Sequence, residues 1–180
     1  STVENNNTTS TPDNTTTGNS QTNINQNFIS ETKINESANK ILNYLKSQQD
    51  ISGKIIDGNT TDWAIMSFGA NGQYASDIKQ LNGKSLLDYE KTYSLNASSD
   101  LNPCTSYPRH IMSLLSAGVQ KTDSAITDLK DQIYNNCYSN NLYGLDGIND
   151  DVFGLIALLS LDVSSSENII RDQIAEIEKW

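Results

Sequence analysis

The sequence is poor in the residue types that most metal and nucleophilic sites use. It contains a single histidine, His110, and two cysteines, Cys104 and Cys137, and it has no Cys-x-x-Cys motif. A zinc site built from cysteine and histidine would lack ligands, so neither such a metal centre nor a zinc enzyme is expected. No nucleophile stands at a recognisable spacing from His110. The two cysteines could form one disulfide or remain reduced, and the sequence leaves both alternatives open.

Basic residues are also scarce. The chain has 12 lysines and arginines against 22 aspartates and glutamates, which gives a formal net charge of −10. Nucleic-acid phosphates and anionic membranes both need a basic face, so neither is an expected partner. No apolar run approaches the ~20 residues that span a bilayer, so no transmembrane segment is predicted.

Composition divides the chain into two parts. Residues 1–33 are almost all asparagine, threonine, serine, glutamine and glycine. Such a segment cannot bury enough apolar surface to offset the entropy lost on ordering. We predict a disordered spacer there, of the kind found between a membrane or wall anchor and a folded domain, and hence a secreted or cell-surface location. A tail without function is the alternative. Residues 34–180 form the predicted folded domain.

The folded part has helical periodicity and no alternating strand signal of useful length. A residue range with no polar face, 152–161, predicts a core helix that is buried on all sides. Thr60 or Thr61 is the expected cap of the second helix, and Pro108 is expected near the first turn of the fourth. The predicted helices cover residues 34–49, 60–72, 85–93, 104–117, 123–135 and 152–161, with a last one ending at Trp180.

One pattern recurs along the chain. Residues 57–63 and 146–152 share an Asp-Gly pair, three further residues, an aspartate and an apolar residue. Aligning Ile65, Ile111 and Gly154 gives a period of about 45 residues, which is typical of helical-hairpin repeats. The amphipathic helices alternate with more apolar ones, so stacked hairpins would bury the apolar member inside. A curved array of this kind is an α/α toroid.

Several segments resemble a known family. They are residues 41–49 (ILNYLKSQQ), 61–66 (TDWAIM), 82–89 (NGKSLLDY), 109–118 (RHIMSLLSAG) and 148–154 (INDDVFG). Together they are similar to the bacterial extracytoplasmic, prenyltransferase-like or squalene-cyclase-like branch of the terpenoid cyclase/protein prenyltransferase superfamily. The resemblance implies an all-α, α/α-toroid fold over residues 34–180. The family toroid has about six hairpins against about three and a half here, so we expect a partial toroid or part of a longer protein.

The resemblance also implies a site with an acidic proton donor, but this sequence departs from the family motif at one position. Family cyclases protonate an alkene with an Asp-x-Asp-Asp motif, in which the middle carboxyl is held protonated. Here Asp150 and Asp151 match, but Ile148 replaces the first aspartate. The sequence is also poor in the aromatic residues that stabilise carbocations. Helix capping by Asn149, Asp150 and Asp151 is the simpler interpretation, so Asp150 and Asp151 stay candidates for a proton-donor pair and no catalytic residue is assigned.

Other polar and aromatic residues could form a binding site. A calcium ion could use the oxygen donors of Asp146, Asn149, Asp150 and Asp151, although their spacing is not that of an EF-hand and no cofactor is otherwise expected. Arg109 and His110 could pair with the rim acids or contact a ligand, and a surface salt bridge is the expected outcome. The candidate ligand-binding residues are Asp62, Trp63, Tyr107, Arg109, His110, Asp146 and Asn149.

The sequence therefore favours a non-catalytic domain that binds an unknown small ligand or a protein partner. A terpenoid-cyclase-like enzyme using Asp150 and Asp151 is one alternative. A structural segment of a longer surface protein is the other. Fold-level analogy alone cannot choose among the three.

Overall fold

The structure, a computed structural model, describes residues 30–95, 102–144 and 147–180. This part of the chain is mostly helical, which confirms the all-α prediction. None of its helices has both the length and the apolar character needed to cross a membrane. In chain order the elements are α1 (Glu31–Ser47), α2 (Gly58–Ala70), α3 (Leu86–Glu90), α4 (Pro103–Ser116), α5 (Ser124–Gln132), the π-helical turn η1 (Ile133–Cys137), β1 (Tyr138–Ser139), β2 (Leu142–Tyr143), α6 (Ile148–Ser160) and α7 (Asn168–Ile177).

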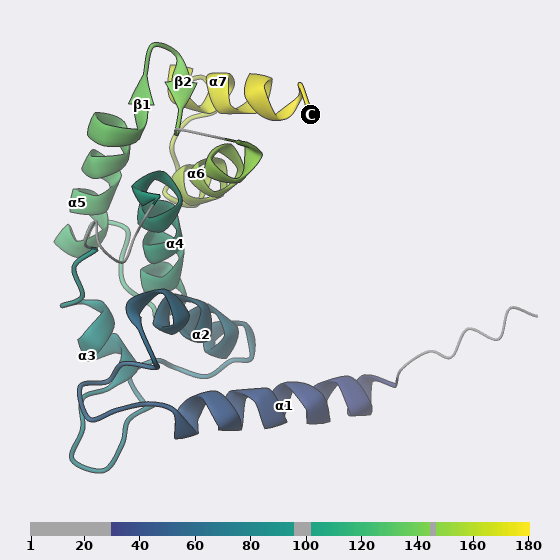
Figure 1. Cartoon of the computed structure of the whole chain (residues 1–180), viewed down its shortest axis with the longest axis vertical. Coiled ribbons are helices and arrows are strands. Elements are labelled where there is room, and N and C mark those ends of the chain that lie inside the picture. Colours follow the sequence, from purple (N-terminus) through teal and green to yellow (C-terminus); the bar gives the residue numbers. More distant parts are fainter. Residues whose placement is uncertain (1–29, 96–101, 145–146) are drawn as a thin grey trace, which may run out of the picture.

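The helices form an inner row and an outer series. α4 packs against α2 on one side and against α6 on the other. Figure 1 shows α2, α4 and α6 as this central row, with α1, α3, α5 and α7 following one another around it from the bottom of the view to the top. The aligned positions Ile65, Ile111 and Gly154 are all buried in the three inner helices. The repeated sequence pattern therefore corresponds to a repeated place in the packing.

Two apolar clusters stabilise this arrangement. One gathers buried side chains around α2 and includes Ile55, Ile65 and Phe68. The other lies around α4 and α6 and includes Ile111 and Leu158. Burying an aliphatic or aromatic side chain contributes roughly 1.5–3 kcal/mol each, so these clusters supply most of the favourable folding energy.

Three predicted helix starts are wrong. α6 begins at Ile148 and not at residue 152, and its cap position is Gly147 without a side-chain cap. Asn149, Asp150 and Asp151 therefore lie in its first turn and do not cap it. α1 begins at Glu31, within the segment assigned to the spacer, and the Ser30 side chain caps it. α2 is capped by Asp57, whose Oδ1 accepts a hydrogen bond from the Thr60 N–H at 2.7 Å. The Thr61 hydroxyl is turned instead to the backbone of Ile55, with which it forms hydrogen bonds. Aspartate at the cap complements the positive end of the helix dipole better than threonine does.

The position of Pro108 also differs from the prediction. Pro103, not Pro108, occupies the first turn of α4, and Pro108 lies inside the helix. A proline there has no N–H for the carbonyl four residues earlier, which belongs to Cys104. That carbonyl accepts a hydrogen bond from the Tyr143 hydroxyl at 2.8 Å. The tertiary contact satisfies the oxygen that the proline leaves without its helical donor.

The sixth helix is not buried on all sides, as its apolar sequence predicted. Ile156 and Leu159 of α6 are 48 % and 45 % exposed. The rings of Trp63 (α2) and Phe153 (α6) meet edge to face with centroids 5.9 Å apart, although α4 packs against both of their helices. α6 thus has an apolar face that the described residues leave uncovered.

A disulfide and a short hairpin follow α5. Cys104 in α4 and Cys137 in η1 are joined by a disulfide, with Cα atoms 5.4 Å apart. Next, β1 pairs with β2 in antiparallel register, and Asn140 and Asn141 form the turn with positive φ angles. Strands of two residues are too short to produce the alternating pattern by which a strand is predicted.

Candidate functional site

A buried group of charged residues lies where α2, α3 and α4 meet. Asp62, on α2, is completely buried. Its Oδ2 accepts a hydrogen bond from Arg109 Nε at 2.8 Å, and its Oδ1 lies 2.8 Å from His110 Nδ1. Arg109 and His110 are consecutive residues of α4 and are both buried. The expected salt bridge of Arg109 therefore exists, but in the interior and not on the surface.

Glu90, the last residue of α3, completes what we call the Asp62 cluster: Asp62, Glu90, Arg109 and His110. Glu90 is only 1 % exposed, and its Oε1 lies 3.0 Å from His110 Nδ1. Within residues 30–95, 102–144 and 147–180, neither Glu90 oxygen accepts a hydrogen bond. A buried carboxylate without hydrogen bonds is costly, which makes Glu90 the least satisfied group of the cluster.

Burial and mutual charge shift the proton affinities of this cluster. Burial raises the pKa of the Glu90 carboxyl above its ordinary value, although His110 opposes the change. Burial alone would lower the pKa of His110, but its interactions with Asp62 and Glu90 outweigh this and raise that pKa. A histidine with a raised pKa holds its proton near neutral pH and is a poor general base.

Charge balance follows from these protonation states. With His110 protonated, the cluster holds two positive groups opposite the carboxyl groups of Asp62 and Glu90. Buried charges persist when they are paired in this way, because an isolated charge would cost far more in the interior. Arg109 is the fixed positive partner, because a guanidinium does not lose its proton in proteins.

Tyr93 covers the imidazole of His110. The two rings meet edge to face with centroids 5.4 Å apart. The Tyr93 ring also lies against the start of α2, where a Cβ added to Gly58 would come within 2.2–2.6 Å of ring atoms. Gly58, the glycine of the first Asp-Gly pair, therefore allows this close approach.

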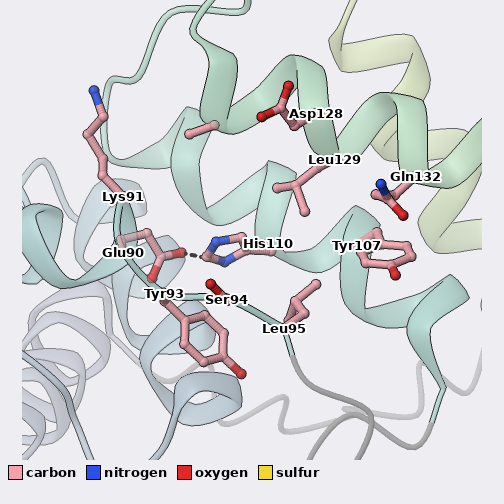
Figure 2. Close-up of a pocket in the computed structure, with 11 residues that line it drawn as sticks. Glu90, Lys91, Tyr93, Ser94, Leu95, Tyr107, His110, Asp128, Leu129 and Gln132 are labelled. Carbon is pink, nitrogen blue, oxygen red and sulfur yellow. Dashed lines mark ion pairs between the residues drawn. The ribbon is translucent and has the colours of Figure 1, made fainter.

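A cavity of about 370 Å³ opens onto the Asp62 cluster. Figure 2 shows Glu90 and His110 on its wall, with Leu129, Gln132 and Tyr107 farther along it. Side chains of α3, α4 and α5 and of the segment after α3 line it. This volume is in the range of small-ligand pockets. The lining mixes charged and polar side chains, such as Lys91 and Asp128, with apolar ones such as Leu129.

The acids at the start of α6 lie in a different environment. Asp150 is buried, and its Oδ1 accepts hydrogen bonds from Asn102 Nδ2 at 2.7 Å and Thr105 Oγ1 at 2.9 Å. Asp151 is also buried, and no described residue forms a hydrogen bond with its Oδ1. Burial, then the charges of Glu176 and Asp150, raise the pKa of Asp151 to about 6. Asp151 lines a second cavity, of about 210 Å³, beside Glu176.

The candidate binding residues are thus only partly brought together. The structure unites Asp62, Arg109 and His110, and it places Tyr107 on the wall of the same cavity. Trp63 is half exposed against Phe153, Asn149 is exposed, and Asp146 lies outside the described residues.

Of the possible calcium donors, Asp146 lies outside the described residues, and Asn149 is exposed. Asp150 is occupied by Asn102 and Thr105. Among the residues that the structure describes, the three that bring metal-ligand atoms within 4.8 Å of one another are Asp62, Glu90 and His110.

Sequence reasoning missed Glu90. It lies in a helix of five residues and is followed by Lys91, a combination that usually marks a solvated surface. A signal was present in the buried Leu86 and in the capping box of Ser85 and Asp88, which fixes the start of α3. That signal locates α3 but does not show that the Glu90 side chain points into the interior.

Comparison of the chain with protein-family models, with curated proteins and with solved structures finds no match.

Proposed function

We propose that this chain is a secreted or cell-surface binding domain that holds a small polar ligand in the cavity above Glu90 and His110. The observation that carries the proposal is the meeting of the cavity of about 370 Å³ with a buried, ionisable and incompletely hydrogen-bonded carboxyl group. A fold gains no stability from leaving such a group unsatisfied, whereas a bound ligand can satisfy it.

The walls indicate the chemistry of that ligand. Glu90 offers two oxygens without hydrogen bonds, so the ligand carries a hydrogen-bond donor such as an amino or hydroxyl group. Tyr107 and Leu129 offer apolar surface for a carbon skeleton, and Gln132 adds a further polar contact. A small amine or a polyol of a few carbon atoms combines these features.

The proposed architecture is a partial α/α toroid. Its support is the inner row of α2, α4 and α6 with the outer helices around it, in the order that alternating hairpins require (Figure 1). The exposed apolar side chains of Trp63, Ile156 and Leu159 also fit, because the inner helices of a toroid line a central space. The disulfide between Cys104 and Cys137 supports an extracytoplasmic location, where such bonds persist.

A cyclase-like activity at Asp150 is less well supported. A proton donor must be free to reach its substrate, but Asp150 Oδ1 already accepts hydrogen bonds from Asn102 and Thr105. Burial raises the pKa of the adjacent Asp151, but Asp151 lines the smaller cavity beside Glu176. The binding function therefore remains our conclusion.

Ligand-observed NMR with a panel of small amines and polyols tests the proposal. We expect one or more compounds to bind the native chain and to lose binding in Ser94→Trp. Ser94 is exposed and lines the cavity, so the larger side chain would block the cavity at little cost to the fold.

Ser165→Trp is the matched control. It makes the same change at an exposed position in the loop before α7, which does not line this cavity. Binding that survives Ser94→Trp as well as Ser165→Trp would place the ligand elsewhere and overturn the proposal, as would the absence of any binding from a broad panel.

A further inference from the structure

Three potential metal ligands converge on one point from three separate helices. Asp62 comes from α2, Glu90 from the end of α3 and His110 from α4. His110 Nδ1 lies 2.8 Å from Asp62 Oδ1 and 3.0 Å from Glu90 Oε1, and the three ligand atoms are all within 4.8 Å of one another. In a tetrahedral zinc site with bonds of about 2.0–2.1 Å, neighbouring ligand atoms are about 3.3 Å apart. Small movements of these side chains would therefore admit an ion.

The environment of Glu90, which also supports the proposed ligand site, gives a second reason to expect an ion. Its carboxyl group is buried and Oε1 forms an ion pair with His110 Nδ1 at 3.0 Å, but beyond this pair neither oxygen accepts a hydrogen bond from a described residue. Unsatisfied buried polar groups are rare in native proteins, and an unoccupied metal position is one accepted explanation. Asp62 has two partners, Arg109 and His110, whereas Glu90 has only the ion pair with His110.

We propose that Asp62, Glu90 and His110 bind a divalent transition-metal ion, with Zn²⁺ as the best match. One imidazole nitrogen with two carboxylates suits zinc, whereas calcium and magnesium prefer six or more oxygen ligands. The ion takes the place of the proton on His110 Nδ1, so that with Arg109 the cluster holds three positive charges beside the two carboxylates. The site differs from one based on cysteine, because both cysteines are committed to the disulfide.

The surroundings of the three ligands match this role. Arg109 Nε donates to Asp62 Oδ2 and so fixes the orientation of that carboxylate, leaving Oδ1 toward His110. Such outer-shell hydrogen bonds are a regular part of metal sites. The cavity reaches Glu90 and His110 and gives a path of entry and room for a fourth ligand, either water or a donor atom of a bound compound. Three protein ligands with one open position is the arrangement of zinc sites that also bind small molecules.

Metal titration of the native chain tests this proposal. After removal of metals with a chelator, Zn²⁺ is added in competition with a chromophoric chelator, and Co²⁺ is added separately for its visible spectrum. We expect one equivalent of each ion and cobalt bands typical of four- or five-coordinate nitrogen and oxygen ligation. Glu90→Gln keeps the shape of the side chain but removes its charge, and we expect affinity to fall by about 100-fold.

Asp128→Asn is the matched control, because Asp128 lines the same cavity but lies outside the trio. It should retain native affinity. If Glu90→Gln does not fold by circular dichroism, anomalous scattering at the zinc edge from a crystal of the native chain decides the question instead. An anomalous peak between the three side chains supports the site.

No binding at micromolar Zn²⁺, binding that Glu90→Gln leaves unchanged, or an anomalous peak elsewhere would each overturn it. The assay contains no organic ligand, so its failure leaves the proposed ligand binding in the cavity standing.

Discussion

The starts of α2 and α6 occupy matching positions in the repeat, but their aspartates have different partners. Asp62 and Asp151 each follow an Asp-Gly pair at the same distance. Asp62 is paired with Arg109 and His110 on α4, whereas Asp151 has one oxygen with no hydrogen bond from the described residues. Its neighbour Asp150 also turns to α4, but it meets the uncharged donors Asn102 and Thr105.

The difference comes from α4, which presents different side chains to its two neighbours. Toward α2 it presents two consecutive cationic residues, and toward α6 it presents uncharged donors near its own start. The α2 side is therefore held by buried ion pairs and the α6 side by hydrogen bonds, while the disulfide of Cys104 joins the start of α4 to η1. The same local pattern thus serves a buried ionic cluster in one place and hydrogen bonds to uncharged donors in the other.

The largest effect is expected from breaking the ionic side. Asp62→Ala would leave Arg109 and His110 buried without their shared counter-charge. Removing one partner of a buried ion pair costs about 3–5 kcal/mol, so the free energy of unfolding should fall by that amount in chemical denaturation. The matched change on the other side, Asp150→Ala, removes hydrogen bonds to uncharged donors and should cost about 1.5–3 kcal/mol. Equal losses would contradict the distinction between the two sides.

Removing the disulfide should destabilise the start of α4 and not the Asp62 cluster. Cys104 and Cys137 close a loop of 33 residues. The chain-entropy model gives about 3–4 kcal/mol for a loop of this length, so Cys104→Ser with Cys137→Ser should lower the free energy of unfolding by that amount. Hydrogen exchange should increase around Asn102, Thr105 and the start of α6 more than around Asp62. Loosening confined to the Asp62 cluster would contradict the comparison.

Asp151→Asn should stabilise the protein at neutral pH. The pKa of Asp151 is about 6 in the folded chain and 3.8 ordinarily. Below pH 3.8 the carboxyl is protonated in both states and costs nothing; as pH rises toward 6 only the unfolded state ionises freely, so the folded state loses relative stability. The amide removes this penalty, which for a difference of about two pKa units is about 3 kcal/mol at pH 7.

Denaturation at several pH values checks this expectation. The advantage of Asp151→Asn should shrink as the pH falls from 6 toward 4. An advantage that is independent of pH would show that charge is not its cause. Glu176→Gln provides a control, because removing that nearby charge should give a smaller gain with the same sign.

The smallest effects are expected from the glycines of the two Asp-Gly pairs, Gly58 and Gly147. An alanine side chain at Gly58 would meet the Tyr93 ring and push it from His110, whereas at Gly147 nothing lies within 4 Å but φ is +98°. Gly147→Ala should cost about 1–2 kcal/mol through backbone strain alone. Gly58→Ala should cost about 1 kcal/mol and shift the NMR signals of the His110 ring, since Tyr93 covers it. Unchanged His110 signals in Gly58→Ala would contradict the contact between the rings of Tyr93 and His110.

Much of the architecture could be predicted because it depends on local patterns. Repeated apolar positions such as Ile65 and Ile111 are spaced for helices and are buried where expected. The exact helix ends were less predictable, since Asp57 and Thr61 compete for the same cap and only the contact of Thr61 with Ile55 decides between them. The exposure of Ile156 was also beyond a local pattern, because it depends on which neighbours cover α6.

The sequence by itself determined the helical class, the acidic character and the repeat that makes Asp62 and Asp151 equivalent. Only the tertiary structure decided which partners these aspartates meet, that Cys104 and Cys137 are joined, and that Glu90 turns inward beside His110. The physical reason is that helix formation depends on neighbours within about four residues, whereas a buried charge depends on side chains that may be 20 to 50 positions away. The interaction of Asp62 with His110, 48 residues later in the chain, is of this second kind.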